Sequence, residues 1–257
     1  MSSERVVLVT GGSRGLGAAI AEAAARAGDR VAVIDMDVST ASFDPALGIG
    51  LFAASVTDES AVEAVLDRLG VPDVVVNNAG IVRFGALLDV TVADFRAVVD
   101  VNLVGTMIVA RAAARRWAAQ GRGGCIVNVT SINGVAAGPS SGAYASSKAG
   151  VALLTSQMAI EWGPLGIRVN AVAPGLIDAG MSEPIYADPV TRQARESKVP
   201  LRRLGLAADI ANVVLFLASD AAAYIHGQNI VVDGGVVGSI IAHLPRPAAV
   251  ELAGPTT

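Results

Sequence analysis

Short, continuously apolar runs alternate with longer segments of helical character along nearly the whole 257-residue chain. The first two runs are Arg5–Thr10 ("RVVLVT") and Arg30–Asp35 ("RVAVID"), and the alanine-rich segment between them, Gly15–Ala27, ends at Gly28. Strands that are apolar on both faces and separated by helices are typical of a parallel sheet, because each connection between parallel strands crosses a face of the sheet and covers it. The pattern therefore predicts an α/β fold.

Five further runs complete a set of seven predicted strands: Ile49–Ala54, Asp73–Asn77, Gly124–Val129, Ile167–Ala173 and Asn229–Val232. The other predicted helices are Asp58–Leu69, Val92–Ala119 (one long helix, or two joined near Gly105), Gly142–Trp162 and Ala207–Ala218. No linker, repeat or low-complexity break divides them, so we expect one doubly wound domain over residues 1–257. The tail 236–257 begins apolar and ends proline-rich. Its first half is expected to pack either on its own domain or at a subunit interface.

The composition argues against several functions. A net charge of −4 offers no basic surface for nucleic acid. The single cysteine, Cys125, excludes an internal disulfide, and with only His226 and His243 it forms no metal-ligand cluster at recognisable spacing. The longest charge-free run, residues 123–147, is rich in Gly, Ser, Asn and Pro, unlike a membrane span of about 20 apolar residues. The first five residues lead directly into a strand without room for a signal peptide. We therefore expect a cytoplasmic protein without a metal, a membrane or a nucleic-acid partner.

A glycine-rich turn, "TGGSRGLG" at residues 10–17, separates the first strand from the first helix. Glycines permit a tight turn in which backbone N–H groups can approach a pyrophosphate at the start of the helix. A turn of this kind can also use glycine only for its backbone freedom. As a cofactor site it would use Gly11, Ser13, Arg14, Gly15, Leu16 and Gly17.

Asp35 ends the second predicted strand 18 residues after Gly17 and favours the functional interpretation of the turn. A carboxylate at this place can accept hydrogen bonds from both hydroxyls of an adenine ribose, and it repels a 2′-phosphate. Arg14 acts in the opposite direction, because a guanidinium can bind a 2′-phosphate. Two charges about 4 Å apart interact by roughly 4 kcal/mol at an effective dielectric of 20, so the two effects are of similar size. Asp35 is better placed, and we predict NAD, with NADP as the less favoured cofactor.

Tyr144 and Lys148 stand four residues apart in "GAYASSKAG", a spacing that places both side chains on one face of a helix. The pair could be an ordinary amphipathic contact. It could also be a tuned phenol, because a neighbouring ammonium favours the phenolate of a tyrosine whose free pKa is about 10. Removing a hydride from an alcohol carbon requires a base at the hydroxyl, which a phenolate provides.

With "TGGSRGLG", Asn77–Gly80 ("NNAG") and "YASSK" in this order, the chain resembles the short-chain dehydrogenase/reductase family. The resemblance runs from about Arg5 to Gly235. It implies an enzyme with a single Rossmann-type domain, a seven-stranded parallel sheet with helices on both faces, and assembly into tetramers or dimers.

The resemblance also implies a catalytic group of Asn102, Ser131, Tyr144 and Lys148. Ser131 lies 13 residues before Tyr144, the usual spacing in the family, and is expected to orient the substrate oxygen. Lys148 is expected to hold the nicotinamide ribose, and Asn102 a water of a proton relay. Without the family, Ser131 would be interpreted as a hydroxyl at a strand end, and Asn102 equally well as a satisfied core asparagine.

Further cofactor contacts follow from the resemblance. Asn78, Ala79 and Gly80 are expected to line the adenosine and ribose side and to brace the central strands, and Pro174, Gly175 and Ile177 to hold the nicotinamide end. Two positions depart from the family pattern. Ser55 stands where many relatives have an aspartate for the adenine amino group, which weakens that contact or shifts it to the Val56 backbone. Ala179 replaces a threonine that bonds the nicotinamide end, so closure of this loop is expected to be looser.

The substrate pocket is expected between the loops after Gly80, Ser131 and Gly175. Its predicted residues are Val82, Phe84, Ser131, Asn133, Val135, Leu176, Met181, Ile185 and Tyr186. They are mostly apolar, which argues against a free polyanion. We expect an NAD-dependent enzyme for a small-molecule secondary alcohol or ketone, with sugar oxidation and 3-oxoacyl reduction left open. The alternatives are an NADP-linked carbonyl or 3-oxoacyl reductase and a non-catalytic nucleotide-sensing Rossmann protein. The retained Tyr144, Lys148 and Ser131 disfavour the last of these.

Overall fold

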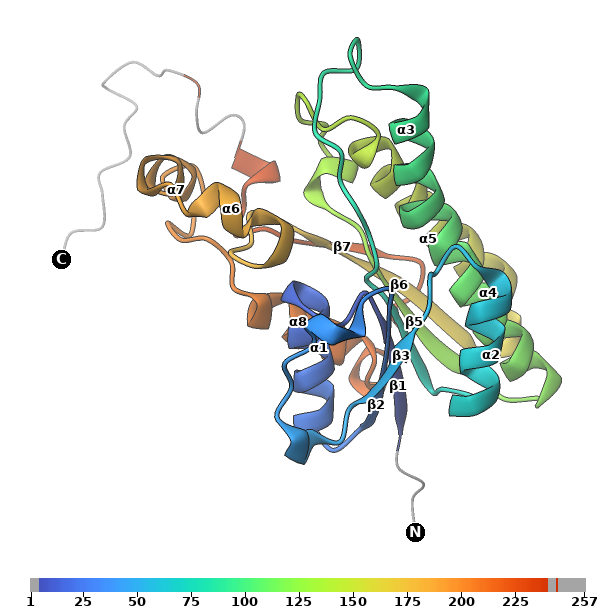
Figure 1. Cartoon of the computed structure of the whole chain (residues 1–257). Helices are drawn as coiled ribbons and strands as arrows, with labels where there is room; N and C mark the ends of the chain where they lie inside the picture. The colour runs from blue at the N-terminus through green and yellow to red at the C-terminus, as the bar shows by residue number, and fades with distance from the viewer. Residues whose placement is uncertain (1–4, 240–243, 245–257) are drawn as a thin grey trace.

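A computed structural model describes residues 5–239 and 244 of the chain (Figure 1). Seven strands form one parallel sheet in the order β3-β2-β1-β4-β5-β6-β7. The strands are β1 (Val6–Thr10), β2 (Arg30–Asp35), β3 (Gly50–Ala53), β4 (Val74–Asn77), β5 (Gly124–Val129), β6 (Ile167–Pro174) and β7 (Asn229–Val232). The direction of winding reverses between β1 and β4, and in open α/β sheets ligands bind outside the carboxyl ends of the strands at this switch point.

Helices cover both faces of the sheet, as the sequence predicts. One face carries α1 (Gly15–Arg26) and α8 (Ala207–Leu217), and the other α2 (Glu59–Leu69), α4 (Gly105–Ala119) and α5 (Tyr144–Trp162). Three helices are shorter: α3 (Val92–Val99) precedes α4, and α6 (Glu183–Tyr186) and α7 (Pro189–Glu196) lie between β6 and α8. Helices α6 and α7 were not predicted, because Pro184 and Pro189 read as breakers. Both prolines instead stand in the first helical turn, where no backbone N–H is needed.

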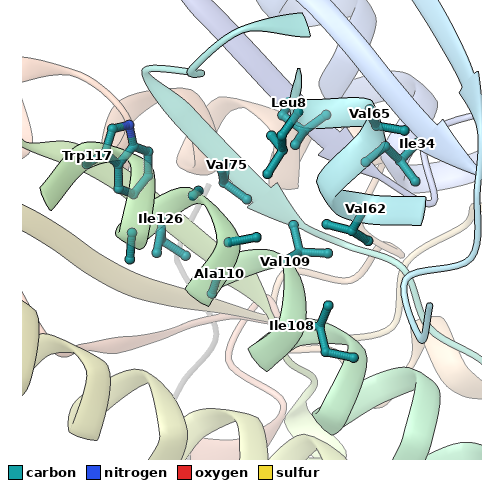
Figure 2. Packing of buried hydrophobic residues seen from close by; sticks show 14 of the residues in the cluster. Leu8, Ile34, Val62, Val65, Val75, Ile108, Val109, Ala110, Trp117 and Ile126 are labelled. Carbon is teal, nitrogen blue, oxygen red and sulfur yellow. The ribbon is translucent and has the colours of Figure 1, made fainter. Parts of the chain in front are cut away.

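The inner strands β1, β2, β4, β5 and β6 are buried on both faces, which explains their continuous apolar sequences, whereas the edge strands β3 and β7 are partly exposed. In β1, Val7 and Val9 belong to the core beneath α1 and α8, whereas Leu8 belongs to the core beneath α2 and α4. Figure 2 shows this second core, where Leu8 and Val75 of the sheet lie near Val109 of α4. Alternation of side chains between two faces therefore fixes the register of each central strand.

Val92–Ala119 forms one continuous helical rod, in which a π turn at Asp100–Val104 joins α3 to α4. By length and composition this rod could cross a membrane, although aspartates and arginines interrupt it, so that it contains no long charge-free run. Its most apolar window is 56% buried by the rest of the protein, as expected for a core helix. The π turn inserts an extra residue, a feature often found at functional sites, and Asn102 lies within it.

The start of the predicted tail follows β7 as a turn. The backbone N–H groups of Gly235 and Val237 donate to the Asp233 carboxylate at 2.7 Å each, and Ser239 is buried. Residues 240–243 and 245–257, on which the expected packing of the tail chiefly depends, lie outside the described residues.

Candidate active site

The glycine-rich turn lies at the carboxyl end of β1, directly before α1. A Cβ atom on Gly17 would lie 2.2 Å from the Gly11 carbonyl oxygen, so this close approach requires glycine. Ser13 is 2% exposed, and its hydroxyl has no hydrogen-bond partner among the described residues. Buried hydroxyls are normally satisfied. An orphaned hydroxyl beside a helix N-terminus therefore fits a ligand that offers phosphate or ribose oxygens.

The "NNAG" segment braces this turn. The Thr10 hydroxyl accepts the N–H groups of Asn78 and Ala79 at 3.1 Å each, and the Asn78 amide donates to the carbonyls of Thr10 (3.1 Å) and Gly11 (2.8 Å). Both Asn78 amide hydrogens are thus used within the protein. The bracing role expected for this segment is therefore visible in the geometry.

Asp35 lies over the same turn. One carboxylate oxygen accepts the Ser13 N–H at 3.1 Å, and the other accepts the Asp37 N–H at 3.3 Å. Hydrogen bonds from Ser39 hold the pKa of Asp37 below its usual value, and the nearby positive charge of Arg14 adds a smaller effect in the same direction. The exposed Arg14 guanidinium therefore lies within electrostatic range of the Asp37 carboxylate.

On the adenine side, Ser55 and Val56 follow β3. The Ser55 hydroxyl shares a 2.8 Å hydrogen bond with Thr57. Val56 is 7% exposed and packs against Gly105, where a Cβ atom would lie 2.7 Å from it. The Val56 side chain is thus part of the core, and only its backbone could serve a ligand.

Lys148 and Tyr144 occupy the first turn of α5, at the carboxyl ends of the central strands. The Lys148 ammonium is buried, donates to the Val129 carbonyl at 2.7 Å and lies 5.7 Å from the centre of the Tyr144 ring. Burial lowers the pKa of Lys148 from 10.5 to about 8. The ammonium is therefore held beside the phenol, and no carboxylate of residues 5–239 forms an ion pair with it.

The surroundings act on Tyr144 in two directions. Burial raises the pKa of the Tyr144 phenol, and a hydrogen bond with Ser131 lowers it by less. The sequence-based expectation of a lowered pKa is therefore not met by the protein frame alone, because desolvation disfavours the phenolate. Further positive charge, such as that of an oxidised nicotinamide, is needed to reverse this direction.

Ser131 lies two residues after the end of β5 and caps a short turn, residues 132–134, that packs against α5. Its hydroxyl accepts the Asn133 N–H at 3.2 Å. A Cβ atom on Gly134 would lie 2.7 Å from the Lys148 carbonyl carbon. This close contact between two backbones fixes the distance between Ser131 and the first turn of α5, which carries Tyr144.

Asn102 is fully buried, and protein groups satisfy its side chain. The Asn102 amide exchanges two hydrogen bonds with the Ile81 backbone, accepting at 2.8 Å and donating at 3.0 Å, and donates another to Ser147 Oγ at 3.0 Å. Its main-chain carbonyl accepts the Thr106 hydroxyl at 2.8 Å. Both amide hydrogens are used within the protein, so they leave no donor for the water expected at Asn102.

The predicted substrate residues occupy two different settings. Phe84, Val135 and Met181 are 67%, 46% and 50% exposed, and they come from the loops after β4, β5 and β6. Val82, Asn133 and Ile185 are half-buried. The first two loops are tied together, because Gly85 donates to the Ser140 carbonyl at 3.0 Å and accepts from Gly142 at 3.2 Å.

The remaining predicted residues are buried or half-buried. Tyr186 is 5% exposed, with the Arg195 guanidinium 5.6 Å from its ring centre. Leu176 and Ile177 line a cavity of about 180 Å³ on the β7 side, together with Val199, Leu201 and Val232 and without any member of the catalytic group. Pro174 ends β6, and Gly175 donates to the Val232 carbonyl at 2.9 Å. Ala179 packs on the core beneath α1 and α8.

Taken together, a phenol, a hydroxyl and a buried ammonium meet at the carboxyl edge of the sheet, beside a turn suited to a dinucleotide. Across residues 5–239 and 244, no three His, Cys, Asp or Glu side chains form a metal site. Sequence reasoning missed Thr10 and Ser147. Both stand inside the motifs that it used, but their hydroxyl partners are far away in the sequence.

Comparisons with known proteins agree with this geometry. The family model described as "Enoyl-(Acyl carrier protein) reductase" matches residues 11–237. The chain is 39% identical to the L-rhamnose 1-dehydrogenase (NAD(P)(+)) of Azotobacter vinelandii, over 91% of this chain and 96% of that protein.

Two solved structures share the fold over nearly their full length. A protein of Agrobacterium tumefaciens, provisionally described as a 2-deoxy-D-gluconate 3-dehydrogenase and bearing NADP, has a TM-score of 0.85, 36% identity and coverage of 92% and 98% of the two chains. A 4-hydroxyisoleucine dehydrogenase complexed with NADH has a TM-score of 0.86, 30% identity and coverage of 91% and 99%.

The chain belongs to the short-chain dehydrogenase/reductase family. It is an oxidoreductase that binds a nicotinamide cofactor.

Proposed function

We propose that this protein is an NAD-dependent dehydrogenase of a secondary alcohol, also acting on the corresponding ketone, with Tyr144 as general acid and base. The observation that carries the proposal is the buried Lys148 ammonium, which lies 5.7 Å from the centre of the Tyr144 ring, together with the effect of Ser131, which lowers the pKa of the phenol. A non-catalytic nucleotide sensor would not need this combination.

The chain's own residues handle the proton. Ser131 holds the substrate oxygen, and the Tyr144 phenolate takes its proton in the oxidation direction, while the Lys148 ammonium stabilises the phenolate. The nicotinamide cofactor, when bound, accepts or supplies the hydride. Gly11 to Gly17, Asp35 and the backbone around Gly80 and Ile177 are the groups that would hold it.

Asp35 supports NAD over NADP. Its carboxylate accepts the Ser13 N–H, and from this position it would oppose a 2′-phosphate. The related proteins include ones described with NADP, with NADH and with either cofactor, so this part of the proposal depends on Asp35 alone.

The apolar rim of Phe84, Val135 and Met181 supports a small-to-medium, largely apolar alcohol or ketone. A sugar or a hydroxylated acid is the second candidate, because the relatives named above include enzymes for such compounds. An NADP-linked carbonyl or 3-oxoacyl reductase would follow if Asp35 proved unimportant.

The test is NADH formation by the purified protein with NAD and a panel of secondary alcohols, diols, sterols and sugars. We expect turnover of at least one class, and loss of turnover in Tyr144→Phe with NADH binding retained. A Tyr144→Phe protein that still turns over the same substrate would disprove the mechanism. A fluorescence titration that shows tighter binding of NADPH than of NADH would disprove the cofactor choice.

We further propose a cytoplasmic homo-oligomer, a tetramer rather than a dimer, that acts without nucleic acid or membrane. Two separate apolar surfaces support this: Leu153 and Ile160 on α5 are 74% and 78% exposed, and Tyr224 and Phe216 lie exposed near α8. Light scattering coupled to gel filtration measures the assembly. A monomer at micromolar concentration would contradict the homo-oligomer, and a dimer would contradict the tetramer.

A further inference from the structure

Ser147 is a fully buried hydroxyl on the first turn of α5, between the two motif residues Tyr144 and Lys148. It donates to the Tyr144 carbonyl at 2.7 Å and accepts a hydrogen from the Asn102 amide at 3.0 Å. A helical serine commonly bonds a carbonyl three or four residues earlier, and that bond needs no other partner. The second bond, to a residue 45 positions away, is the unusual feature.

We infer that Ser147 is a positioning residue for the proton transfer, which ties the Tyr144 turn of α5 to the π turn that carries Asn102. The inference rests on the proposed function, because it assumes that Tyr144 transfers the proton.

Two elements, α5 and the π turn, meet at this hydroxyl, and a third, the loop at Ile81, is bound to it through Asn102. Asn102 is held by Ser147 on one side and clamps the Ile81 backbone on the other. Gly80, just before Ile81, fills the space between Asn102 and Lys148, because a Cβ atom there would lie 3.2 Å from Asn102 Oδ1 and 3.4 Å from Lys148 Nζ. The cofactor-side loop, the π turn and the first turn of α5 are therefore coupled through one serine.

Removal of the hydroxyl has a defined consequence. It leaves one Asn102 N–H buried without a partner, since the other amide hydrogen is used by Ile81. The π turn or the first turn of α5 must then shift to recover a bond. A shift of the α5 turn changes how closely the phenol approaches the Lys148 ammonium and the Ser131 hydroxyl.

Few other charges could account for a change at the phenol. Lys148 lies beside the Tyr144 ring, and the turn at residues 132–134 carries no charged side chain. Asp100 of the π turn and Arg83 of the loop after β4 are both exposed to solvent. The titration of Tyr144 therefore reports the placement of Lys148 and Ser131.

The experiment follows this titration directly. The chain has three tyrosines, so the double variant Tyr186→Phe/Tyr224→Phe leaves Tyr144 as the single one. The ultraviolet absorbance of tyrosinate then gives its titration midpoint, with and without NAD. In this parent we expect Ser147→Ala to raise the midpoint by about half a pH unit or more. Ser147→Thr, which keeps the hydroxyl, should restore it, and Ser146→Ala, an exposed neighbour, should leave it unchanged.

Turnover supplies the second readout. Ser147→Ala in the otherwise native protein should lower kcat by about tenfold or more, with the alkaline shift of its pH profile matching the titration and KM for NAD little changed. If Ser147→Ala does not fold, Ser147→Cys, similar in size but with a weaker donor, takes its place, and a smaller shift is expected.

Two results would overturn the inference. One is a Ser147→Ala protein whose titration midpoint and kcat equal those of its parent. The other is a Ser147→Ala protein that loses kcat but shows no shift of the midpoint, or a shift that Ser147→Thr does not restore. Failure of the proposed function is a separate result, namely turnover by Tyr144→Phe.

Discussion

At the scale of single residues, the most unusual group is the Lys148 ammonium, which is buried and has no carboxylate partner in the described part of the chain. Its pKa is about 8 in the folded protein, against an ordinary value of 10.5. Between these values the unfolded chain binds a proton that the folded protein does not. Folding stability from this group is therefore fully present above pH 10.5 and is lost as the pH falls through 8.

This predicts how Lys148→Met changes the free energy of unfolding. As the pH rises from 8 to 10, the free energy of unfolding of the wild type should increase by up to about 3 kcal/mol relative to that of the variant. Below pH 7 the difference between the two free energies should not change with pH. Urea unfolding of both proteins across this range, without cofactor, measures it. Lys198→Met, which removes the chain's other lysine from an exposed position, should give no such slope. A pH-independent difference for Lys148→Met would contradict the prediction.

Asp35 carries the second prediction at this scale. Asp35→Ser removes the carboxylate over the turn, and we expect the preference for NAD over NADP, as a ratio of kcat/KM values, to fall about tenfold or more. Asp37→Asn is the matched control, because it removes the neighbouring carboxylate but leaves Asp35 against Ser13. A larger effect of the control than of Asp35→Ser would show that the selectivity depends on the field around Arg14 instead.

At the scale of elements, the seven strands and the helices on both faces could be predicted, because burial on two faces leaves continuous apolar sequence. The join near Gly105 was also foreseen, although not its form as a π turn. The short helices α6 and α7 were missed because their prolines resemble loop signals. Of the site, Tyr144, Lys148 and the glycine turn could be found from local spacing. The links of Ser147 to Asn102 and of Thr10 to Asn78 join distant segments, and no local pattern reports them.

The seating of the turn at residues 132–134 on α5 gives an element-scale prediction. In Gly134→Ala the new Cβ atom would lie 2.7 Å from the Lys148 carbonyl carbon of α5. A helix backbone cannot move aside to relieve such a clash as a flexible side chain can. We expect a loss of about 1–3 kcal/mol of stability and a fall in kcat, as Ser131 is lifted from Tyr144. Thermal unfolding and steady-state kinetics measure the two effects.

Gly138→Ala is the matched control in the same loop. Its Cβ would meet only the Asn133 side chain, at 3.4 Å. It should be close to wild type in both measurements. Equal effects of the two substitutions would show that the loop, rather than its seat on α5, sets the position of Ser131.

At the scale of the whole molecule, the turn after β1, the end of β2, the loop after β4 and the start of α5 meet only in the folded chain. A ligand that binds this meeting point binds the folded state and not the unfolded one. At a hundredfold excess over its dissociation constant it stabilises the fold by about 2.7 kcal/mol. For a chain of this length each kcal/mol raises Tm by about 2–4 °C, so saturating NADH should raise Tm by roughly 5–10 °C.

Differential scanning fluorimetry tests this prediction. NADH and NADPH are each added at a hundredfold excess over the dissociation constant that a titration gives for that cofactor. Tyr144→Phe should keep the full shift, because the phenol acts on the substrate proton, whereas Asp35→Ser should need more NADH to reach it. A shift that Tyr144→Phe abolishes would mean that the phenol, and not the turn at Ser13 and Asp35, holds the cofactor. The absence of any shift at a hundredfold excess would mean that NADH does not bind the folded state in preference to the unfolded chain, and it would contradict a cofactor site built from segments that meet only on folding.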